Sequence, residues 1–151
     1  MILHEYELVT IFRPDLEDAA LKADVEKIEG IVSDNGGTLL ITDDWGKRKL
    51  AYPVRKHLKG HYVLVSFLSA PTLITEVERN LRIMEPVIRF LTSKVGDDVD
   101  IAVRVAEAAE QRIRMAEEAA RAEAEAEARA KAEEEARAAA AALEAEAVAR
   151  A

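Results

Sequence analysis

The chain has 151 residues, a formal net charge of -8 and no cysteine. The lack of cysteine excludes disulfides, thiol nucleophiles and thiolate-bound metals. No stretch has the length and apolar character of a membrane-spanning helix or the pattern of a secretory signal, so we expect a cytoplasmic protein with no membrane contact.

Residues 5–12 form the first predicted element. Polar and apolar side chains alternate there with a period of two, which predicts a strand with one more polar face. Arg13 and Pro14 interrupt the alternation, and Asp15 is the expected N-cap of a helix. The apolar residues of that helix recur at steps of four, three and four: Leu21, Val25, Ile28 and Val32. This spacing predicts one buried helix face, and a glycine pair at residues 36–37 ends the helix.

A long strand is expected over residues 38–54. Gly46 lies inside this extended stretch and predicts a bulge or bend, while Pro53 favours a place at the edge of a sheet. We expect the chain to turn at residues 57–60 and to continue as a well-buried strand over residues 61–68.

A second helix and a last strand complete the pattern. Pro71 opens the helix, Pro86 ends it, and residues 87–95 form the strand. The order strand, helix, strand, strand, helix, strand predicts an α+β fold of ferredoxin-like βαββαβ topology. In this fold a four-stranded antiparallel sheet carries both helices on one face and leaves the other face open.

Composition changes sharply near residue 100. All glycines, prolines and aromatic residues lie at or before Gly96, whereas residues 101–151 hold 23 alanines, 12 glutamates and 8 Lys/Arg. Such a segment favours a helix but offers little to a core, and no heptad seam of large apolar residues runs along it. We therefore predict a domain at residues 1–96 and a helical or partly disordered extension at residues 97–151.

A basic, aromatic segment at residues 45–62 stands out in this acidic chain. It contains six Lys/Arg, two His and three aromatic residues but no carboxylate, whereas the other 133 residues hold 15 Lys/Arg and 29 Asp/Glu. Positive charge beside aromatic rings is the combination that RNA binding uses. The candidate RNA- or partner-binding residues are Trp45, Lys47, Arg48, Lys49, Arg55 and Lys59. A structural alternative stays open for the rings, because Tyr52 and Tyr62 also fit a core and Trp45 fits a cover over the bend.

No pattern of catalytic or metal-binding residues appears in the sequence. His57 and His61 are four apart, but a strand pattern follows Gly60, and no third ligand stands at a familiar spacing. The segment Asn35-Gly36-Gly37 lacks the frame of a phosphate-binding glycine loop. We expect no enzymatic activity, and neither a cofactor, a metal nor a small-molecule substrate.

Six segments follow one another along residues 5–95 in a recognisable order. They are Glu5-Tyr6-Glu7, the Arg13-Pro14-x-Leu16 step, the Gly36-Gly37 pair, WGKRKLAYPV at 45–54, KGHY at 59–62 and NLRIMEPVIRFL at 80–91. Together they resemble the bacterial small-subunit ribosomal protein six family. The resemblance implies a non-enzymatic, ferredoxin-like protein that binds the central domain of small-subunit ribosomal RNA together with ribosomal protein eighteen.

Carried over position by position, the resemblance implies RNA contacts at Tyr6, Lys56, Arg82 and Arg89. For Lys47, Arg48 and Lys49 it implies a contact with either RNA or the partner protein. The chain departs from the family in two places. Leu3, His4 and Glu5 stand where members often carry arginine just before the tyrosine, and the extension runs well beyond the usual end of the family.

Charge sets the expected strength of RNA binding. Residues 1–96 carry 13 Lys/Arg against 14 Asp/Glu, so RNA binding alone is expected to be weak and salt-sensitive, with help from a partner. The alternative interpretation is a protein-binding adaptor that uses the open sheet face without RNA contact. A third interpretation, an enzyme, requires a convergent polar pocket.

Overall fold

A computed structural model describes the backbone of residues 3–97 and 99–149, and the side chains as far as residue 140. In chain order the elements are β1 (His4–Phe12), α1 (Asp18–Asp34), β2 (Thr38–Val54), β3 (His57–Ser69), α2 (Pro71–Ile83), β4 (Val87–Gly96) and α3 (Ile101–Ala149). The four strands form one antiparallel sheet in the order β2-β3-β1-β4. The predicted βαββαβ topology is therefore confirmed, with β2 at one edge.

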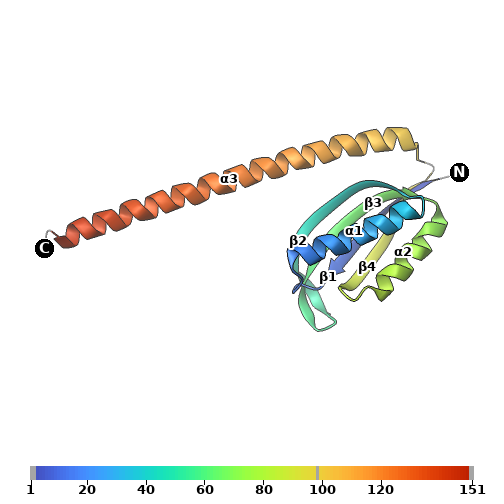
Figure 1. The fold of residues 1–151 in the computed structure, drawn as a ribbon, viewed down its shortest axis with the longest axis horizontal. Coiled ribbons are helices and arrows are strands. Elements are labelled where there is room, and N and C mark those ends of the chain that lie inside the picture. The colour runs from blue at the N-terminus through green and yellow to red at the C-terminus, as the bar shows by residue number, and fades with distance from the viewer. Residues whose placement is uncertain (1–2, 98, 150–151) are drawn as a thin grey trace. The chain divides into compact units, whose positions relative to one another are not determined.

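The main core lies between the sheet and the two helices α1 and α2, which Figure 1 shows side by side on the same face. The predicted stripe of α1 is buried at Leu21, Ile28 and Val32, and α2 adds a matching stripe. Phe12 and Phe67, both fully buried, meet these stripes from the sheet. Each such apolar side chain contributes roughly 1.5–3 kcal/mol on burial, so this layer supplies most of the stability of the fold.

The start of α1 differs from its prediction. Asp15 was expected as the N-cap, but the helix begins at Asp18 with Glu17 as N-cap, and no side chain caps it. Asp15 instead lies in a turn after Pro14, where Arg13 approaches its carboxylate at 3.5 Å. A short-range cap pattern is a weak signal, and a neighbouring cation here offers the carboxylate another partner.

The turn between β2 and β3 also lies elsewhere than predicted. It is made by Arg55 and Lys56, both with positive φ angles (45° and 68°), and β3 already begins at His57. Gly60 is thus a buried strand residue rather than a turn residue. A Cβ atom at Gly60 would lie 2.3 Å from the side chain of Ile11, so glycine is needed there for close approach between strands.

The long strand β2 has the kink that its sequence predicts. Its pairing with β3 shifts register between Leu39 and Ile41 and again between Asp44 and Gly46, which has a φ of 76°. The second shift is the expected bulge at Gly46, and it leaves Trp45 as the extra residue of the strand.

The second sheet face is not wholly open, which corrects the sequence-based expectation. Residues 99–109, here called the root of α3, pack on its far end: Val99, Val105 and Ala108 meet Leu40 and Leu68. Arg104 donates two hydrogen bonds of 2.8 Å to the Glu5 carboxylate. Periodicity along the chain could not reveal this contact, because its partners are 99 residues apart.

The chain separates into two compact units, residues 1–109 and residues 110–151. In the second unit α3 continues to Ala149, and from Arg112 to Ala140 every side chain except that of Met115 is exposed. The predicted helical extension is confirmed as a helix. The domain boundary at residue 96, as a statement about which part folds by itself, stays a prediction.

Candidate nucleic-acid interface

The second half of β2 and the first part of β3 form a hairpin at residues 47–60 that extends past the end of β1. The last β1 residue, Phe12, pairs with His61, and the strands continue beyond it to the turn at Arg55 and Lys56. Figure 1 shows this hairpin as the teal-to-green loop that projects from the sheet. Six of its residues are basic and none is acidic: Lys47, Arg48, Lys49, Arg55, Lys56 and Lys59.

The hairpin bends over the otherwise open face of the sheet. Leu50 and Val54 from β2 pack with Ile11 from β1 and Ile88 from β4. At the turn, Arg55 donates a hydrogen bond of 3.2 Å from Nη1 to the carbonyl oxygen of Val87. These contacts fix the basic turn beside the start of β4.

Arg89 on β4 meets the bent hairpin through Tyr52. The Arg89 guanidinium donates a hydrogen bond to the Tyr52 hydroxyl and lies 5.8 Å from the centre of the tyrosine ring. A second pair of this kind lies on β2, where Arg48 is 5.5 Å from the centre of the Trp45 ring and donates to the Trp45 carbonyl oxygen. The partners of both arginines in these contacts are neutral, so no negative charge offsets the two guanidinium groups there.

Other arginines of the first unit are neutralised by carboxylates. Arg79 pairs with Glu76 at 2.6 Å, Arg82 with Glu78 at 3.2 Å and Arg104 with Glu5 at 2.8 Å. Within the described residues, Arg48, Arg55 and Arg89 have no carboxylate within 4.0 Å. Among the arginines of the first unit, those without a carboxylate partner are therefore concentrated at the hairpin end.

Two lysines add to this charge in an unfavourable arrangement. Lys49 on β2 and Lys59 on β3 are direct partners across the hairpin. Like charges at directly opposed positions destabilise a strand pair by repulsion. An anion bound between the two ammonium groups would relieve that repulsion.

The structure brings some of the predicted site residues together and separates others. Lys47, Arg48, Lys49, Arg55, Lys56 and Lys59 share the hairpin, and Trp45 and Arg89 adjoin it. Tyr6 lies in the core instead, 7% exposed and with its ring stacked on Phe67 at 6.1 Å. Arg82 lies in the last turn of α2, in the helix layer.

Sequence reasoning missed Tyr52 as a site residue and gave a core as one of its alternatives. Its side chain is 57% exposed, and its only described hydrogen bond is to Arg89. The alternation of β2 indicates which face Tyr52 takes, but no local signal shows that the hairpin bends over β4. Tyr62, in contrast, is partly buried in the small cluster under the hairpin.

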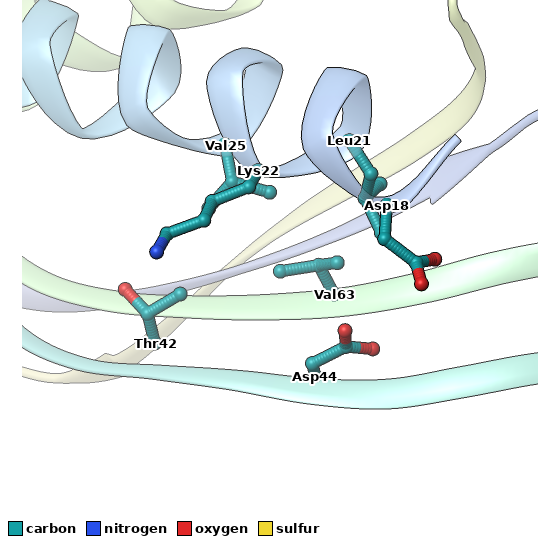
Figure 2. Close-up of a pocket in the computed structure, with 7 residues that line it drawn as sticks. All are labelled: Asp18, Leu21, Lys22, Val25, Thr42, Asp44 and Val63. Atoms are coloured by element: carbon teal, nitrogen blue, oxygen red, sulfur yellow. The ribbon is translucent and has the colours of Figure 1, made fainter. Parts of the chain in front are cut away.

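A hollow of about 290 Å³ lies between α1 and β2, on the helix side of the sheet. Figure 2 shows Val63 at its floor, with Lys22 and Asp18 of α1 pointing toward different ends of it. The carboxylate of Asp44 at its rim is engaged by the Gly46 backbone N–H at 2.8 Å and by His61 at 2.5 Å. The Thr42 hydroxyl in its lining donates a hydrogen bond to the Glu29 carboxylate.

The described part of the chain contains no group of three His, Cys, Asp or Glu side chains placed to hold a metal ion. None of the helices in that part is both long enough and apolar enough to cross a membrane.

Comparison with known proteins gives a consistent result. A family model described as Ribosomal protein S6 matches residues 5–94. The Small ribosomal subunit protein bS6 of Moorella thermoacetica is 43% identical over 96 residues, which cover 64% of this chain and 98% of that protein. The protein of the same name from Syntrophotalea carbinolica is 43% identical over 116 residues, covering 77% of this chain and 99% of its own length.

A solved structure extends the likeness to the fold. The crystal structure of 30S ribosomal protein S6 from Thermotoga maritima aligns with a TM-score of 0.60 at 24% identity, covering 62% of this chain and 88% of that one.

Proposed function

The chain belongs to the ribosomal protein S6 family of the small ribosomal subunit, and on that premise we propose that it binds small-subunit ribosomal RNA through the hairpin end. The proposal includes the central domain of that RNA as the target and ribosomal protein eighteen as a partner in binding. The family consists of structural proteins rather than enzymes, which confirms the prediction that the chain has no enzymatic activity.

The observation that carries the RNA proposal is the unneutralised charge of the hairpin. Six cations on residues 47–60 occur with no carboxylate, and Arg89 adds a seventh charge from β4. Phosphate contacts supply most of the affinity between proteins and nucleic acids, and each one releases a counterion. An RNA backbone is the ligand class that matches a dense set of this kind.

Partner help is part of the same proposal. The first 96 residues carry nearly equal numbers of basic and acidic residues, so attraction to RNA is confined to one end. The open face beside the hairpin offers an apolar row on three neighbouring strands, Leu91, Val9 and Leu64, with Leu91 67% exposed. This row supports a protein contact, and we assign it to ribosomal protein eighteen.

The same row also supports the alternative, a protein-binding adaptor with no RNA contact. In that case the exposed Leu91 is the main anchor and the hairpin cations are solvated. The two functions differ in what happens when single cations are removed, because only RNA binding depends on them.

The test compares arginines of the two kinds described above. Arg55→Ala and Arg89→Ala are each expected to weaken binding of the full chain to small-subunit ribosomal RNA by about tenfold or more, the value of one charge-assisted contact. Each is also expected to flatten the slope of log affinity against log salt by about 0.7–0.9. Arg79→Ala is the matched control, because Glu76 already neutralises that arginine.

The outcome separates the two functions. If RNA affinity and salt slope are unchanged in both Arg55→Ala and Arg89→Ala, the RNA proposal is wrong and the adaptor remains.

The other predicted contacts are expected to contribute less. Arg82→Ala is expected to have a smaller effect than Arg89→Ala, because Glu78 pairs with Arg82. Tyr6 has little exposed surface and lies toward the end of β1 opposite the hairpin, so its predicted RNA contact is separate from the proposed site.

A further inference from the structure

We propose that Tyr52 is a positioning residue for Arg89, holding its guanidinium in place to receive an RNA phosphate. The inference rests on the proposed RNA-binding function and goes beyond it by adding a residue that acts through another. It starts from the observation that three arginines in or beside the hairpin have no carboxylate partner and are each held by a neutral group. These groups are a carbonyl oxygen for Arg55, the Trp45 ring and carbonyl for Arg48, and the Tyr52 ring and hydroxyl for Arg89.

The Tyr52 contact is not a by-product of strand pairing. Tyr52 is on β2 and Arg89 on β4, and two strands, β3 and β1, lie between them in the sheet. The two residues meet only because the hairpin bends across the sheet face over Ile11 and Ile88. A contact that requires this bend is a property of the tertiary fold.

Core packing does not account for the contact either. The tyrosine is 57% exposed, so burial of apolar area does little to fix its ring. The Tyr52 ring faces the Arg89 guanidinium, and its hydroxyl accepts a hydrogen bond from it. Together these two contacts define the direction of the arginine head group.

The chemistry of the pair explains why a neutral partner suits this role. A guanidinium has five N–H donors, and the hydroxyl of Tyr52 accepts from one nitrogen, Nη1. The remaining donors include those on Nε and Nη2, which form the planar fork that matches a phosphate. A carboxylate in the place of Tyr52 would orient the arginine equally well but cancel its charge.

Fixing the arginine before binding lowers the entropic cost of the contact. An arginine left free in solution loses rotamer freedom when it binds, and that loss subtracts from the affinity. Tyr52 removes part of the cost in the free protein. We therefore expect Tyr52→Ala to weaken RNA binding by about two- to tenfold, the cost of ordering one long side chain.

A double-mutant cycle in the full chain tests the inference. Binding to small-subunit ribosomal RNA, with ribosomal protein eighteen present, is measured for Tyr52→Ala, Tyr52→Phe, Arg89→Ala and the Tyr52→Ala/Arg89→Ala pair. The phenylalanine variant keeps the ring and loses the hydroxyl, so its affinity is expected between those of wild type and Tyr52→Ala. In the Arg89→Ala background, Tyr52→Ala is expected to have no further effect.

The matched control is Leu58→Ala. Leu58 is another large exposed side chain of the same hairpin, 64% exposed, and its truncation is expected to leave RNA affinity unchanged. Thermal unfolding checks that each variant folds. If Tyr52→Ala does not fold, Tyr52→Phe carries the test, because it removes only the atom that accepts the hydrogen bond.

The possible failures can be told apart. Additive effects of Tyr52→Ala and Arg89→Ala, with Arg89→Ala itself weakening RNA binding, would overturn the positioning role and leave the RNA function intact. No effect of Arg89→Ala on RNA binding would overturn both. Tyr52→Ala could instead weaken only the binding of ribosomal protein eighteen, measured without RNA. That result would show that the positioned charge serves a carboxylate of the partner protein, and it would also overturn the inference.

Discussion

The two ends of the second sheet face use arginine in opposite ways. At the root of α3, Arg104 is only 21% exposed and makes two hydrogen bonds to Glu5, whose side chain is 9% exposed. At the hairpin end, Arg55 and Arg89 are held by neutral oxygens, and no carboxylate offsets their charge. A neutralised arginine can serve only the fold, whereas an arginine that is oriented without being neutralised remains able to bind an anion.

The largest expected effect lies at the root. Truncation after Gly96 removes Val99, Val105 and Ala108 from Leu40 and Leu68 and leaves Glu5 without its partner. We expect it to lower the free energy of unfolding by about 3–5 kcal/mol, from lost apolar burial and an unpaired carboxylate. Urea unfolding followed by circular dichroism measures the change.

Truncation after Ala109 is the control for that experiment. It removes the second unit and keeps the root, so the unfolding free energy is expected to change by less than about 1 kcal/mol. Equal stability of the two truncated chains would contradict a stabilising role for the root.

A smaller effect is expected from the Arg104–Glu5 pair alone. Arg104→Ala leaves a buried carboxylate unpaired, and because the arginine is partly exposed we expect a loss of about 2 kcal/mol rather than the full value for a buried pair. Arg79→Ala, whose pair with Glu76 is exposed, should cost less than about 1 kcal/mol. Comparable losses in the two variants would remove the distinction between a structural and a surface arginine.

Local patterns in the sequence predicted the elements but not the contacts that bend and cover the sheet. The α1 stripe, the kink at Gly46 and the edge position of β2 follow from spacing and from residue type, and all three are confirmed. Each of these depends on residues close in the chain. The basic composition of residues 45–62 likewise coincides with the hairpin at the end of β2 and the start of β3.

The features that the sequence did not predict depend instead on residues far apart in the chain. Arg55 and Lys56 adopt left-handed angles without being glycine, because the Arg55 contact to Val87 and the packing under the hairpin hold the turn. The Tyr52–Arg89 contact joins residues 37 apart and the Glu5–Arg104 contact residues 99 apart. Long-range contacts leave no periodic trace in a single sequence, which is why the turn, Tyr52 and the root were missed.

At the hairpin we expect one substitution to raise stability and to weaken RNA binding. Lys49→Gln removes the repulsion with Lys59, so the unbound protein is expected to gain about 0.2–1 kcal/mol. The same change removes a cation and should weaken RNA binding. Lys27→Gln is the control, because Lys27 pairs with Asp24 at 2.8 Å and its loss should lower stability slightly and leave RNA binding unchanged. A variant at Lys49 that is both less stable and unaltered in binding would contradict the proposed site.

The smallest effect concerns the exposed pair just before the root. The Lys94 ammonium, through a hydrogen bond of 2.6 Å, holds the pKa of Asp97 below its ordinary value of 3.8. A lowered folded-state pKa means that the pair stabilises the protein above the unfolded value and that this contribution is lost as pH falls through the folded value. We expect Lys94→Gln to raise the pKa of Asp97 toward 3.8, as measured by NMR titration of its carboxyl carbon. An unshifted titration would show that the pair does not form.

The position of β2 at the sheet edge has a further consequence for the protein before it is assembled into a ribosome. A strand of 17 residues at a sheet edge is a template on which other chains can add and aggregate. Its register shifts at Leu40 and Trp45, its proline at 53 and its lysines at 47 and 49 are the features that discourage such pairing. We therefore expect the two lysines, which we propose to bind RNA, also to oppose edge-to-edge pairing between copies of the protein.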